Sequence, residues 1–378
     1  MRRLLFLMYA LIFVDETALQ AIVPLVPSYK EALDLSGFQS GLLLSAASLA
    51  IVVGSIPGGL AGDRLGSRRV TLAAGGLLAV SCLGQGVAPD LWTLLAARLA
   101  FGVASATIWS AGLSWLSDST SDRPGALGAV MAIAGAAGMA GPVFAGVVAD
   151  RVSRGAPFVI LGVLSAAITG ALLLADHGSE RHHEHHPLRR VLGLARRDAL
   201  IAGAVIMMLL GGFSDGVVNL IGPSQLADAG KSSAWIGLVL SVAAGLFILF
   251  AAVTARAGRR AVTLALGAVC SALSAVVLGP VLVSGSVAVV ASMLLLRAPL
   301  LGAMYAICFP LGVGGARRVG VGAGSINGLL GFAWGGASFL GAVVAGSFVE
   351  AAGAQAVYAL PAAACVVATG ALLVLARR

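Results

Sequence analysis

The chain has 378 residues, of which 59% are hydrophobic and 11% charged, and its mean hydropathy is +1.00. A soluble domain carries about 25% charged residues, so this composition excludes a large soluble domain and favours a membrane protein. The net charge of +8 does not indicate nucleic-acid binding, because the basic residues fall in short segments between apolar runs, as the positive-inside rule describes.

Twelve apolar runs follow one another along the chain, each close to the roughly 20 residues that a helix needs to cross a bilayer. They supply no polar face of the kind that a soluble helix has, so we predict twelve transmembrane helices. The expected bounds are 4–27, 38–61, 70–88, 91–113, 125–149, 156–175, 199–221, 234–254, 261–283, 286–311, 319–348 and 356–376. The predicted fold class is all-α and polytopic, with both termini on one side of the membrane.

The first predicted span carries two adjacent carboxylates, Asp15 and Glu16. Arg2 and Arg3 precede it as in a secretory signal, but the acids and the lack of a small-residue cleavage site indicate a retained span. Charges inside a span are costly and mark functional sites. At helical rise Asp15 lies about 16 Å from the inner boundary, and we expect it to face a central cavity. For Glu16, about 100° away around the helix, a functional role and simple packing both stay open.

A charged segment, Gly59–Val70, separates the second and third runs. Gly59 and Gly66 permit close packing and positive φ there. Its charged residues lie where helix ends and neighbouring loops can receive them; they are Asp63, Arg64, Arg68 and Arg69. The segment is predicted to be a tight loop at the membrane surface.

This segment resembles the signature loop of the major facilitator superfamily, which joins that family's second and third spans. The matching residues are Gly59, Asp63, Arg64, Gly66 and Arg68. Ser67 stands where the family has its first basic residue, for which we expect Arg69 to compensate. The resemblance implies a gating loop that latches the outward-facing state, with Asp63 at a helix N-terminus across the half interface and Arg68 near Asp118 or Asp122. The alternative is an ordinary basic loop with a turn glycine.

The fourth predicted span carries Arg98, about 10 Å from the outer boundary at helical rise. In a hydrocarbon core about 30 Å thick, Asp15 lies about 14 Å from the outer boundary. The depths of Asp15 and Arg98 therefore agree within the error of the predicted bounds, and we predict an ion pair between them. Gly102 follows four residues later, which resembles the superfamily's fourth-span motif, although Phe101 stands at its usual glutamine. Because that arginine is associated with proton transfer in proton-coupled members, the resemblance implies this role for Arg98.

The fifth predicted span is rich in glycine and resembles the fifth-span motif of the family's antiporter branch. The likeness rests on Gly135, Gly138, Gly141, Pro142 and Gly146, with Ala145 replacing one glycine. General packing through small residues is the alternative. The first-span segment from Asp15 to Pro24, which ends in Val-Pro-Leu-Val-Pro27, is also similar to the family's drug and amine antiporters.

A polar stretch, Asp176–Asp198, divides the twelve runs into two sets of six. The predicted organisation is an N-terminal half at 1–175, a cytoplasmic central loop at 176–198 and a C-terminal half at 199–378. All five histidines lie in this loop, at His177, His182, His183, His185 and His186. Imidazole is a common metal ligand, but a solvated linker is the better interpretation, and no metal site is predicted.

The two sets of six runs resemble each other in order, as pseudo-symmetric halves do. The echoes pair Asp15, Gln20 and Pro24 with Asp215, Asn219 and Pro223, and Arg98 with Arg297. Repeats of this kind place a substrate site near the bilayer midplane where the halves meet. The predicted proton-coupling and substrate residues are Asp15, Glu16, Gln20, Arg98, Asp215, Asn219, Arg297 and Asn327. Asp215 is expected nearer the outer surface, in a gating role.

The distribution of basic residues predicts the orientation. Most of the 24 lysines and arginines fall on the side that holds the N-terminus, and only Lys30, Arg151, Arg154 and Lys231 fall on the other. The positive-inside rule therefore places both termini in the cytoplasm. We expect a multi-pass protein of the inner or plasma membrane.

A transport mechanism follows as a hypothesis. If Asp15 makes and breaks its contact with Arg98 as the halves move, its hold on a proton changes with conformation. A cationic substrate and a proton would then compete for one carboxylate, which is antiport. We predict a secondary active transporter that exports a hydrophobic or cationic small molecule by alternating access, acting as a monomer in the lipid bilayer without a cofactor.

Other functions remain open at this point. Arg98 and Arg297 facing one cavity favour uptake or exchange of an organic anion or sugar, although Arg297 has a second interpretation as a partner of Asp215. A third possible function, after cation export and transport of an anion or sugar, is that of a non-transporting membrane sensor or scaffold. No nucleophile–base arrangement, phosphate-cradling loop or metal spacing indicates an enzyme, and the four cysteines are expected to be small core residues. Trp109, Tyr305, Phe332 and Trp334 are expected to pack or face lipid, with lining of an apolar cavity as the alternative.

Overall fold

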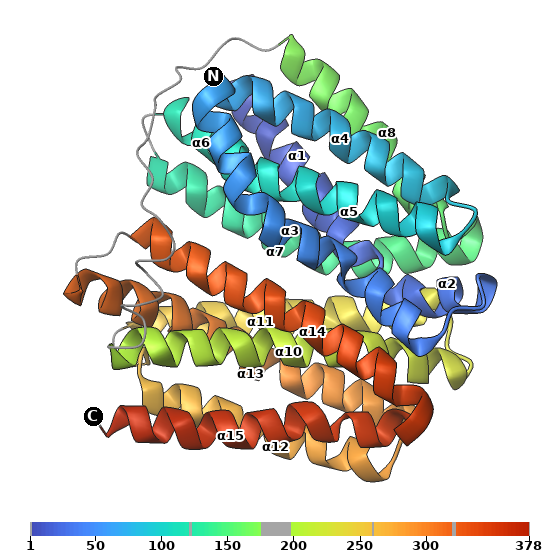
Figure 1. Cartoon of the computed structure of the whole chain (residues 1–378), viewed down its shortest axis with the longest axis vertical. Coiled ribbons are helices and arrows are strands. Elements are labelled where there is room, and N and C mark those ends of the chain that lie inside the picture. Colours follow the sequence, from blue (N-terminus) through green and yellow to red (C-terminus); the bar gives the residue numbers. More distant parts are fainter. Residues whose placement is uncertain (1, 121–122, 175–197, 259–260, 320–322, 378) are drawn as a thin grey trace. The chain divides into compact units, whose positions relative to one another are not determined.

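The computed structural model describes residues 2–120, 123–174, 198–258, 261–319 and 323–377, and these residues form helices and no strand (Figure 1). The helices of the first part are α1 Arg2–Ala21, a short 3₁₀ turn Val23–Leu25, α2 Val26–Ala32, α3 Gly37–Leu65, α4 Ser67–Val87, α5 Leu91–Thr107, a π-helical turn Ile108–Gly112, α6 Leu113–Asp118, α7 Arg123–Arg151 and α8 Ala156–Leu173. Those of the second part are α10 Ala199–Asp228, α11 Ser233–Arg256, α12 Leu264–Val283, α13 Val287–Arg318, α14 Ala323–Val357 and α15 Ala359–Ala376.

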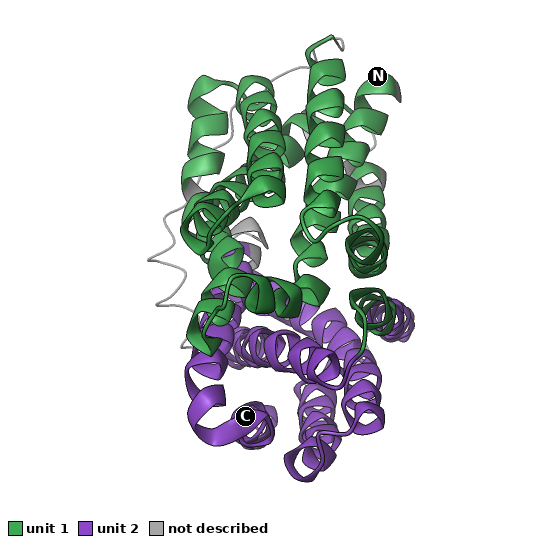
Figure 2. Cartoon of the chain, turned by 90° about the vertical axis from the view of Figure 1, so that its right-hand side faces the viewer, with its two compact units in different colours: residues 1–184, 231–241 green, residues 185–230, 242–378 purple. Residues whose placement is uncertain are grey.

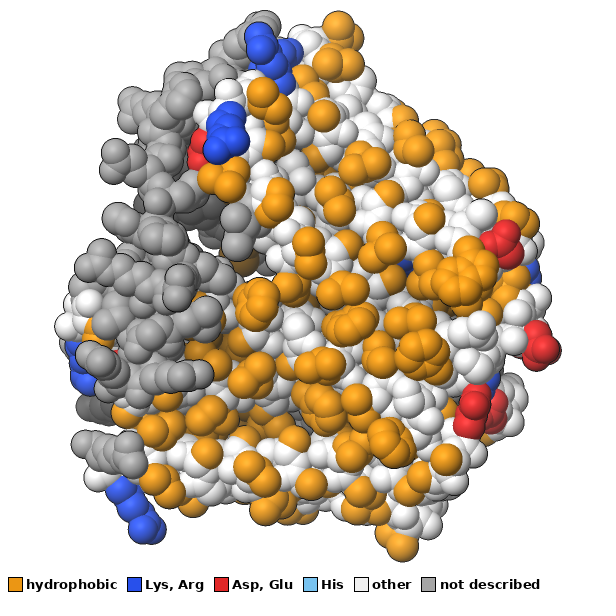
Figure 3. Space-filling model, in the orientation of Figure 1, with side chains coloured by type: hydrophobic (Ala, Val, Ile, Leu, Met, Phe, Trp, Pro, Cys, Tyr) orange, Lys and Arg blue, Asp and Glu red, His pale blue; other side chains and the backbone are white. Residues whose placement is uncertain are grey.

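Within the described residues, twelve helical segments are long and apolar enough to cross a membrane, which confirms the predicted all-α polytopic fold. Several run further than the apolar pattern predicts. The first extends over Arg3–Ala32, because the chain continues through the 3₁₀ turn at Pro24 into α2. On the face seen in Figure 3, hydrophobic side chains cover the middle of the helices and the charged side chains lie near their ends, as lipid contact requires.

Short polar side chains set where several helices begin. Ser36 and Gln39 form a reciprocal capping box at the start of α3. Asp90 caps α5 by accepting a hydrogen bond from the Thr93 backbone N–H at 2.9 Å, and this bond lowers the pKa of the exposed Asp90 carboxyl. Asp198 caps α10 by accepting bonds from the N–H groups of Leu200 and Ile201. These caps satisfy backbone donors that a helix start leaves free.

The chain divides into two compact units (Figure 2). Unit 1 comprises Met1–Glu184 together with Lys231–Ser241, and unit 2 comprises His185–Gly230 and Val242–Arg378. The first part of α11 therefore belongs to unit 1, which the linear pattern does not indicate. The predicted halves at 1–175 and 199–378 stay a prediction, and residues 176–197 of the predicted central loop, with all five histidines, lie outside the described residues.

Close helix contacts hold each unit together. In unit 1, α1 packs against α7 and α8, α3 against α5, and α4 against α5 and α8; in unit 2, α10 packs against α13 and α14, and α12 against α15. Glycine permits the tightest of them: a Cβ on Gly102 of α5 would overlap the Ala47 carbonyl oxygen, and one on Gly216 of α10 would overlap that of Ser338. Small residues at such crossings are the usual route to dense helix packing in lipid.

Candidate functional site

The carboxylate of Asp15 is buried in unit 1 and is held by α5 and the turn that follows it. Its Oδ2 accepts hydrogen bonds from Ser105 Oγ at 3.0 Å and from Trp109 Nε1 at 2.9 Å. Its Oδ1 is buried without a hydrogen-bond partner, and the residue is 0% exposed. A buried charge is costly without a partner, so this oxygen is where a proton or a cation would be most strongly favoured.

Arg98 is equally buried, at 1% exposure, but it has other partners. Its Nη1 donates to Gln85 Oε1 on α4 at 3.3 Å, and its guanidinium lies 5.3 Å from the ring centroid of Phe101. Phe101, which replaces the family's usual glutamine, thus receives the cation on its ring. The Arg98 Nε atom is buried without a hydrogen-bond partner.

The predicted ion pair between Asp15 and Arg98 is therefore wrong for this conformation. The partner of Asp15 is Ser105, which lies seven residues beyond Arg98 on α5 and so about 10 Å further along the axis. The depth of Asp15 was estimated from the inner boundary and that of Arg98 from the outer boundary. The two depths agreed only within the error of the predicted span bounds.

Glu16 and Gln20 contact each other, since the Gln20 Nε2 donates to Glu16 Oε1 at 3.1 Å. Both side chains are half-buried, and they lie four residues apart on α1, as an i, i+4 pair. Glu16 is thus a neighbour of the Asp15 cluster but is not bonded to Ser105 or Trp109.

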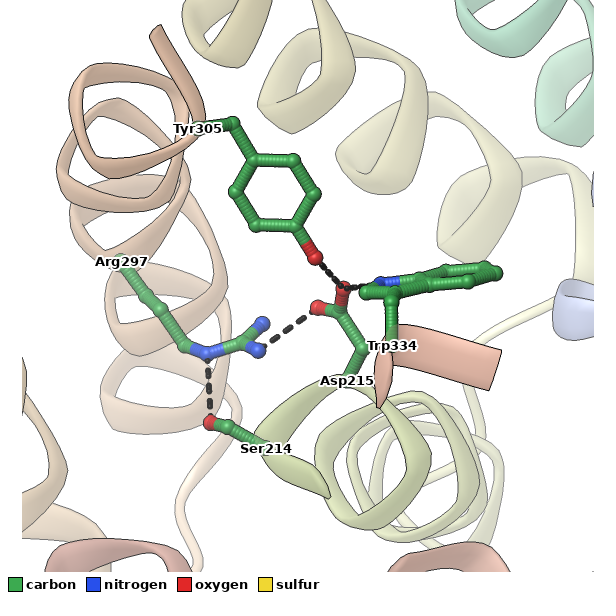
Figure 4. Close-up of polar contacts among 5 residues, drawn as sticks. All are labelled: Ser214, Asp215, Arg297, Tyr305 and Trp334. Carbon is green, nitrogen blue, oxygen red and sulfur yellow. Dashed lines mark hydrogen bonds and ion pairs between the residues drawn. The ribbon is translucent and has the colours of Figure 1, made fainter. Parts of the chain in front are cut away.

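A second carboxylate cluster lies in unit 2, around Asp215 of α10 (Figure 4). Arg297 of α13 donates from Nη2 to Asp215 Oδ1 at 2.7 Å and from Nε to Ser214 Oγ at 3.1 Å. Tyr305 OH and Trp334 Nε1 reach Asp215 Oδ2 at 3.3 and 3.5 Å. Both oxygens of this carboxylate are therefore used, one of them by a cation, and the interpretation of Arg297 as a partner of Asp215 is confirmed.

The two clusters are similar in plan and different in charge. Each has a carboxylate on the first helix of its set and an indole N–H that reaches Oδ2. Asp215 has an arginine and Asp15 does not. The other predicted residues add little: Asn219 is half-buried one turn beyond Asp215, and the side chain of Asn327 lies outside the described residues.

Three residues of these clusters were absent from the predicted site: Ser105, Gln85 and Ser214. Trp109, Tyr305 and Trp334 were expected mainly to pack or face lipid, yet each donates a hydrogen bond to a carboxylate. The sequence spacing could have indicated Ser105 and Trp109. They follow Arg98 at steps of seven and four residues, which keep the three side chains on one helix face.

The segment Gly59–Val70 is almost wholly helical, so the predicted tight loop is present but is much shorter than expected. α3 runs through Leu65, α4 starts at Ser67, and only Gly66, at φ 93°, lies between them. The predicted positive φ at Gly66 is confirmed. A residue with a Cβ rarely adopts such a φ, so glycine suits this position. The close packing is made by Gly58 and Gly62, where a Cβ would lie 2.9 Å from atoms of Thr107 and Ala111, and not by Gly59.

The charged residues of this segment have different surroundings. Arg64 and Arg69 are exposed, whereas Asp63 and Arg68 are half-buried. Arg68 Nη2 donates to the Leu173 carbonyl oxygen at the end of α8, at 3.1 Å. The implied partners of Arg68, the Asp118 side chain and Asp122, lie outside the described residues, so the gating role stays a prediction.

The glycines of the fifth predicted span have specific neighbours. A Cβ on Gly141 would lie 2.9 Å from the Thr17 carbonyl oxygen of α1, and one on Gly146 would overlap the Ser233 carbonyl oxygen at the start of α11. Pro142 contributes its carbonyl oxygen to the same contact, against Gly237. Gly138, in contrast, has nothing within 4 Å of where its Cβ would lie.

Hydrogen bonds also connect α7 with the start of α11 within unit 1. Both carboxylate oxygens of Asp150 accept from backbone N–H groups at the start of α11, Oδ1 from Ser233 at 3.2 Å and Oδ2 from Ala234 at 2.8 Å. The Val143 N–H donates to Ser241 Oγ at 3.1 Å. A carboxylate at a helix N-terminus is favourably placed, so α7 both packs against and caps α11.

Gly146→Ala is therefore expected to weaken the protein, whereas Gly138→Ala is not. The Cβ at position 146 meets backbone, which cannot move aside cheaply, and overpacking costs typically 1–3 kcal/mol. At position 138 there is room, and alanine favours the helix by up to about 1 kcal/mol. Unfolding midpoints of the two variants in detergent check this, and equal stability would show that the α7–α11 contact is not a tight one.

Among the described residues, no three His, Cys, Asp or Glu side chains lie close enough together to hold a metal ion. The four cysteines, Cys82, Cys270, Cys308 and Cys365, are buried and unbridged, which confirms their predicted place in the helix cores. Cys308 Sγ lies 3.3 Å from Met208 Sδ, a sulfur contact of the core.

Twelve candidate spans among the described residues, carboxylates and arginines inside them, and glycine contacts between helices together define a polytopic membrane protein. The chain belongs to the Major Facilitator Superfamily, whose family model matches residues 5–327. This establishes the family that the signature segment resembles.

Curated relatives are similar over parts of the chain. It is 31% identical over 139 residues to the MFS-type transporter ppzB of Metarhizium majus, and 29% identical over 180 residues to the multidrug resistance protein MdtG of Serratia proteamaculans. These alignments cover 36% and 46% of this chain, and 30% and 44% of the relatives. The chain thus matches less than half the length of either.

Solved transporters share the fold over almost the whole chain. The nucleoside transporter NupG, as its D323A mutant, superimposes with a TM-score of 0.80 at 15% identity, covering 98% of this chain and 99% of that one. A bacterial homologue of the lysosomal transporter Spinster gives 0.75 at 14% identity, covering 99% and 95%. At such identities the likeness concerns the fold alone.

Proposed function

We propose that this transporter exchanges protons for a hydrophobic or cationic small molecule by alternating access, and that Asp15 is the group for which the two compete. The observation that carries the proposal is the Asp15 Oδ1 atom, buried and without a hydrogen-bond partner. A carboxylate in this setting is best satisfied by a proton or by a cation. Competition of both for one oxygen is the simplest form of antiport.

The contrast with Asp215 supports the choice of Asp15. Arg297 neutralises Asp215 at 2.7 Å, so this pair offers no net charge to a cation. Asp215 is also more accessible, with 21% of its side chain exposed. We therefore assign Asp215, together with Tyr305 and Trp334, to a polar and aromatic cluster of unit 2 and not to proton exchange.

Transport of an organic anion is the second candidate, and Arg98 is the observation in its favour. It is a buried cation whose partners, Gln85 and Phe101, are neutral, and its Nε lacks a hydrogen bond. Arg297 no longer supports this candidate, because Asp215 already occupies it. Sugar uptake rests on no contact of its own.

The remaining assignments belong to the same proposal. The distribution of basic residues supports cytoplasmic termini, and we expect the protein in the inner or plasma membrane. We expect it to act as a monomer, with protons and lipid as its only other partners. The first-span segment and the fifth-span glycines resemble the drug:proton antiporter branch, and the similarity to a multidrug resistance protein supports the same proposal.

Purified protein in proteoliposomes with a pH dye inside tests the proposal. Lipophilic cations such as tetraphenylphosphonium and ethidium, and organic anions such as salicylate, are added outside in turn. We expect a cation to release protons from the lumen faster than in protein-free liposomes. Proton flux driven only by anions would move the site to Arg98, and no response to any compound would contradict the proposed coupling.

A further inference from the structure

The hydrogen bonds of Asp15 are strongly one-sided, and this asymmetry carries an inference that rests on the proposed function. We infer that Trp109 and Ser105 are positioning residues: they hold Oδ2 of Asp15 and leave Oδ1 as the atom that takes up the proton or cation. Through these bonds they also set the pH at which exchange proceeds. Neither residue needs to touch the substrate to do so.

The two donors come from one side of the carboxylate. Ser105 Oγ and Trp109 Nε1 lie 3.0 and 2.9 Å from Oδ2, and they are four residues apart, on one face of the fourth span. Oδ1 receives neither bond. Because two donors converge on Oδ2, the carboxylate plane is fixed and its two oxygens are chemically distinct.

The indole makes this distinction permanent. Its N–H is a donor at every pH and has no acceptor function, so a proton on Oδ2 would point at another N–H hydrogen and lose the bond. The serine hydroxyl can rotate to donate or accept, so it adapts to either state. Protonation is therefore directed to Oδ1, and a cation that replaces the proton must approach the same atom.

The local backbone places Trp109 for this task. It lies in the π-helical turn Ile108–Gly112, between α5 and α6. Such turns widen a helix and occur mostly as single turns at functional sites. The turn begins directly before Trp109, four residues after Ser105, so the two donors to Asp15 lie where the helix starts to widen.

Few other charges compete with these bonds. On α1 the neighbour is Glu16, on α4 it is Cys82, and on α5 it is Arg98, two turns from Ser105. α8 has no titratable residue, and those of α7 lie at its ends, at Arg123, Asp150 and Arg151. Ser105 and Trp109 thus supply the hydrogen bonds to Asp15 that a conservative substitution can remove, and Glu16 is the neighbouring charge.

Trp109→Phe in the proteoliposome assay, measured across pH with a lipophilic cation, tests the inference. Hydrogen bonds to a carboxylate favour its charged form, so removing one strengthens proton binding. We expect the pH midpoint of exchange to rise by about one unit, a tenfold change in proton affinity. Ser105→Ala is expected to shift it in the same direction, by less, because the indole bond remains.

Trp115→Phe is the matched control. Trp115 is also buried in unit 1, but its Nε1 has no hydrogen-bond partner, so this change removes the same atoms without removing a bond to Asp15. We expect it to leave the midpoint unchanged even where it lowers the protein yield. An unshifted midpoint in Trp109→Phe, or an equal shift in Trp115→Phe, overturns the inference.

The parent variant Asp15→Asn separates the two proposals. If it abolishes coupling while Trp109→Phe keeps the wild-type midpoint, the proposed function stands and the positioning role fails. If Asp15→Asn keeps wild-type coupling, the proposed function itself fails, and the inference fails with it.

Discussion

Asp15→Asn is expected to reduce cation-driven proton release to the level of protein-free liposomes while leaving a folded protein. The amide cannot exchange a proton near neutral pH, so the shared group is lost. Its oxygen still accepts the bonds from Ser105 and Trp109, and its NH₂ takes the place of the unpartnered Oδ1. The change therefore removes the chemistry and keeps the local packing. The assay of cation-driven proton flux measures it directly.

Glu16→Gln is the informative comparison for this result. Glu16 lies next in the chain, is half-buried and is bonded to Gln20, so the same chemical change is made a few ångströms away. We expect proton coupling to persist in Glu16→Gln. Loss of coupling in this variant with retention in Asp15→Asn would transfer the proton-binding role to Glu16. The unfolding midpoints of both proteins show whether either loss merely reflects misfolding.

Arg297→Met is expected to lower the free energy of unfolding by about 3 kcal/mol, because it leaves Asp215 with an uncompensated charge. The partial exposure of Asp215, at 21% of its side chain, and the bonds from Tyr305 and Trp334 keep the loss at the lower end of what breaking a buried pair costs. Equilibrium unfolding in mixed detergent micelles measures it.

The double variant Arg297→Met with Asp215→Leu shows whether the pair itself is the cause. Replacing both members of a buried ion pair by apolar residues is often nearly neutral, so we expect the double variant to recover most of the lost stability. A coupling energy near zero in this cycle would mean that Arg297 and Asp215 act independently. In that case Arg297 would again be free to serve the organic-anion alternative.

Much of this architecture is determined by local sequence, without reference to distant residues. Whether a run crosses a bilayer depends on its own length and hydropathy, so twelve spans follow from the sequence and the structure confirms them. The charges inside apolar runs are visible for the same reason, because a charged residue stands out among apolar ones; they are Asp15, Arg98, Asp215 and Arg297. The family followed from residue types at fixed spacing in Gly59–Val70, and the family model confirms it.

The partners of those charges depend on tertiary structure. Which side chain meets Asp15 is determined by the rotation and axial offset of one helix against another, and hydropathy reports neither quantity. Arg98 and Ser105 share one face of α5 about 10 Å apart, and the offset of α1 selects Ser105. The same reason separates Gly146, which touches α11, from Gly138 in the same glycine-rich run, which touches nothing. Sequence alone thus determined which residues are buried and charged, and only helix packing decided that Arg297 neutralises Asp215 while Asp15 keeps one oxygen free.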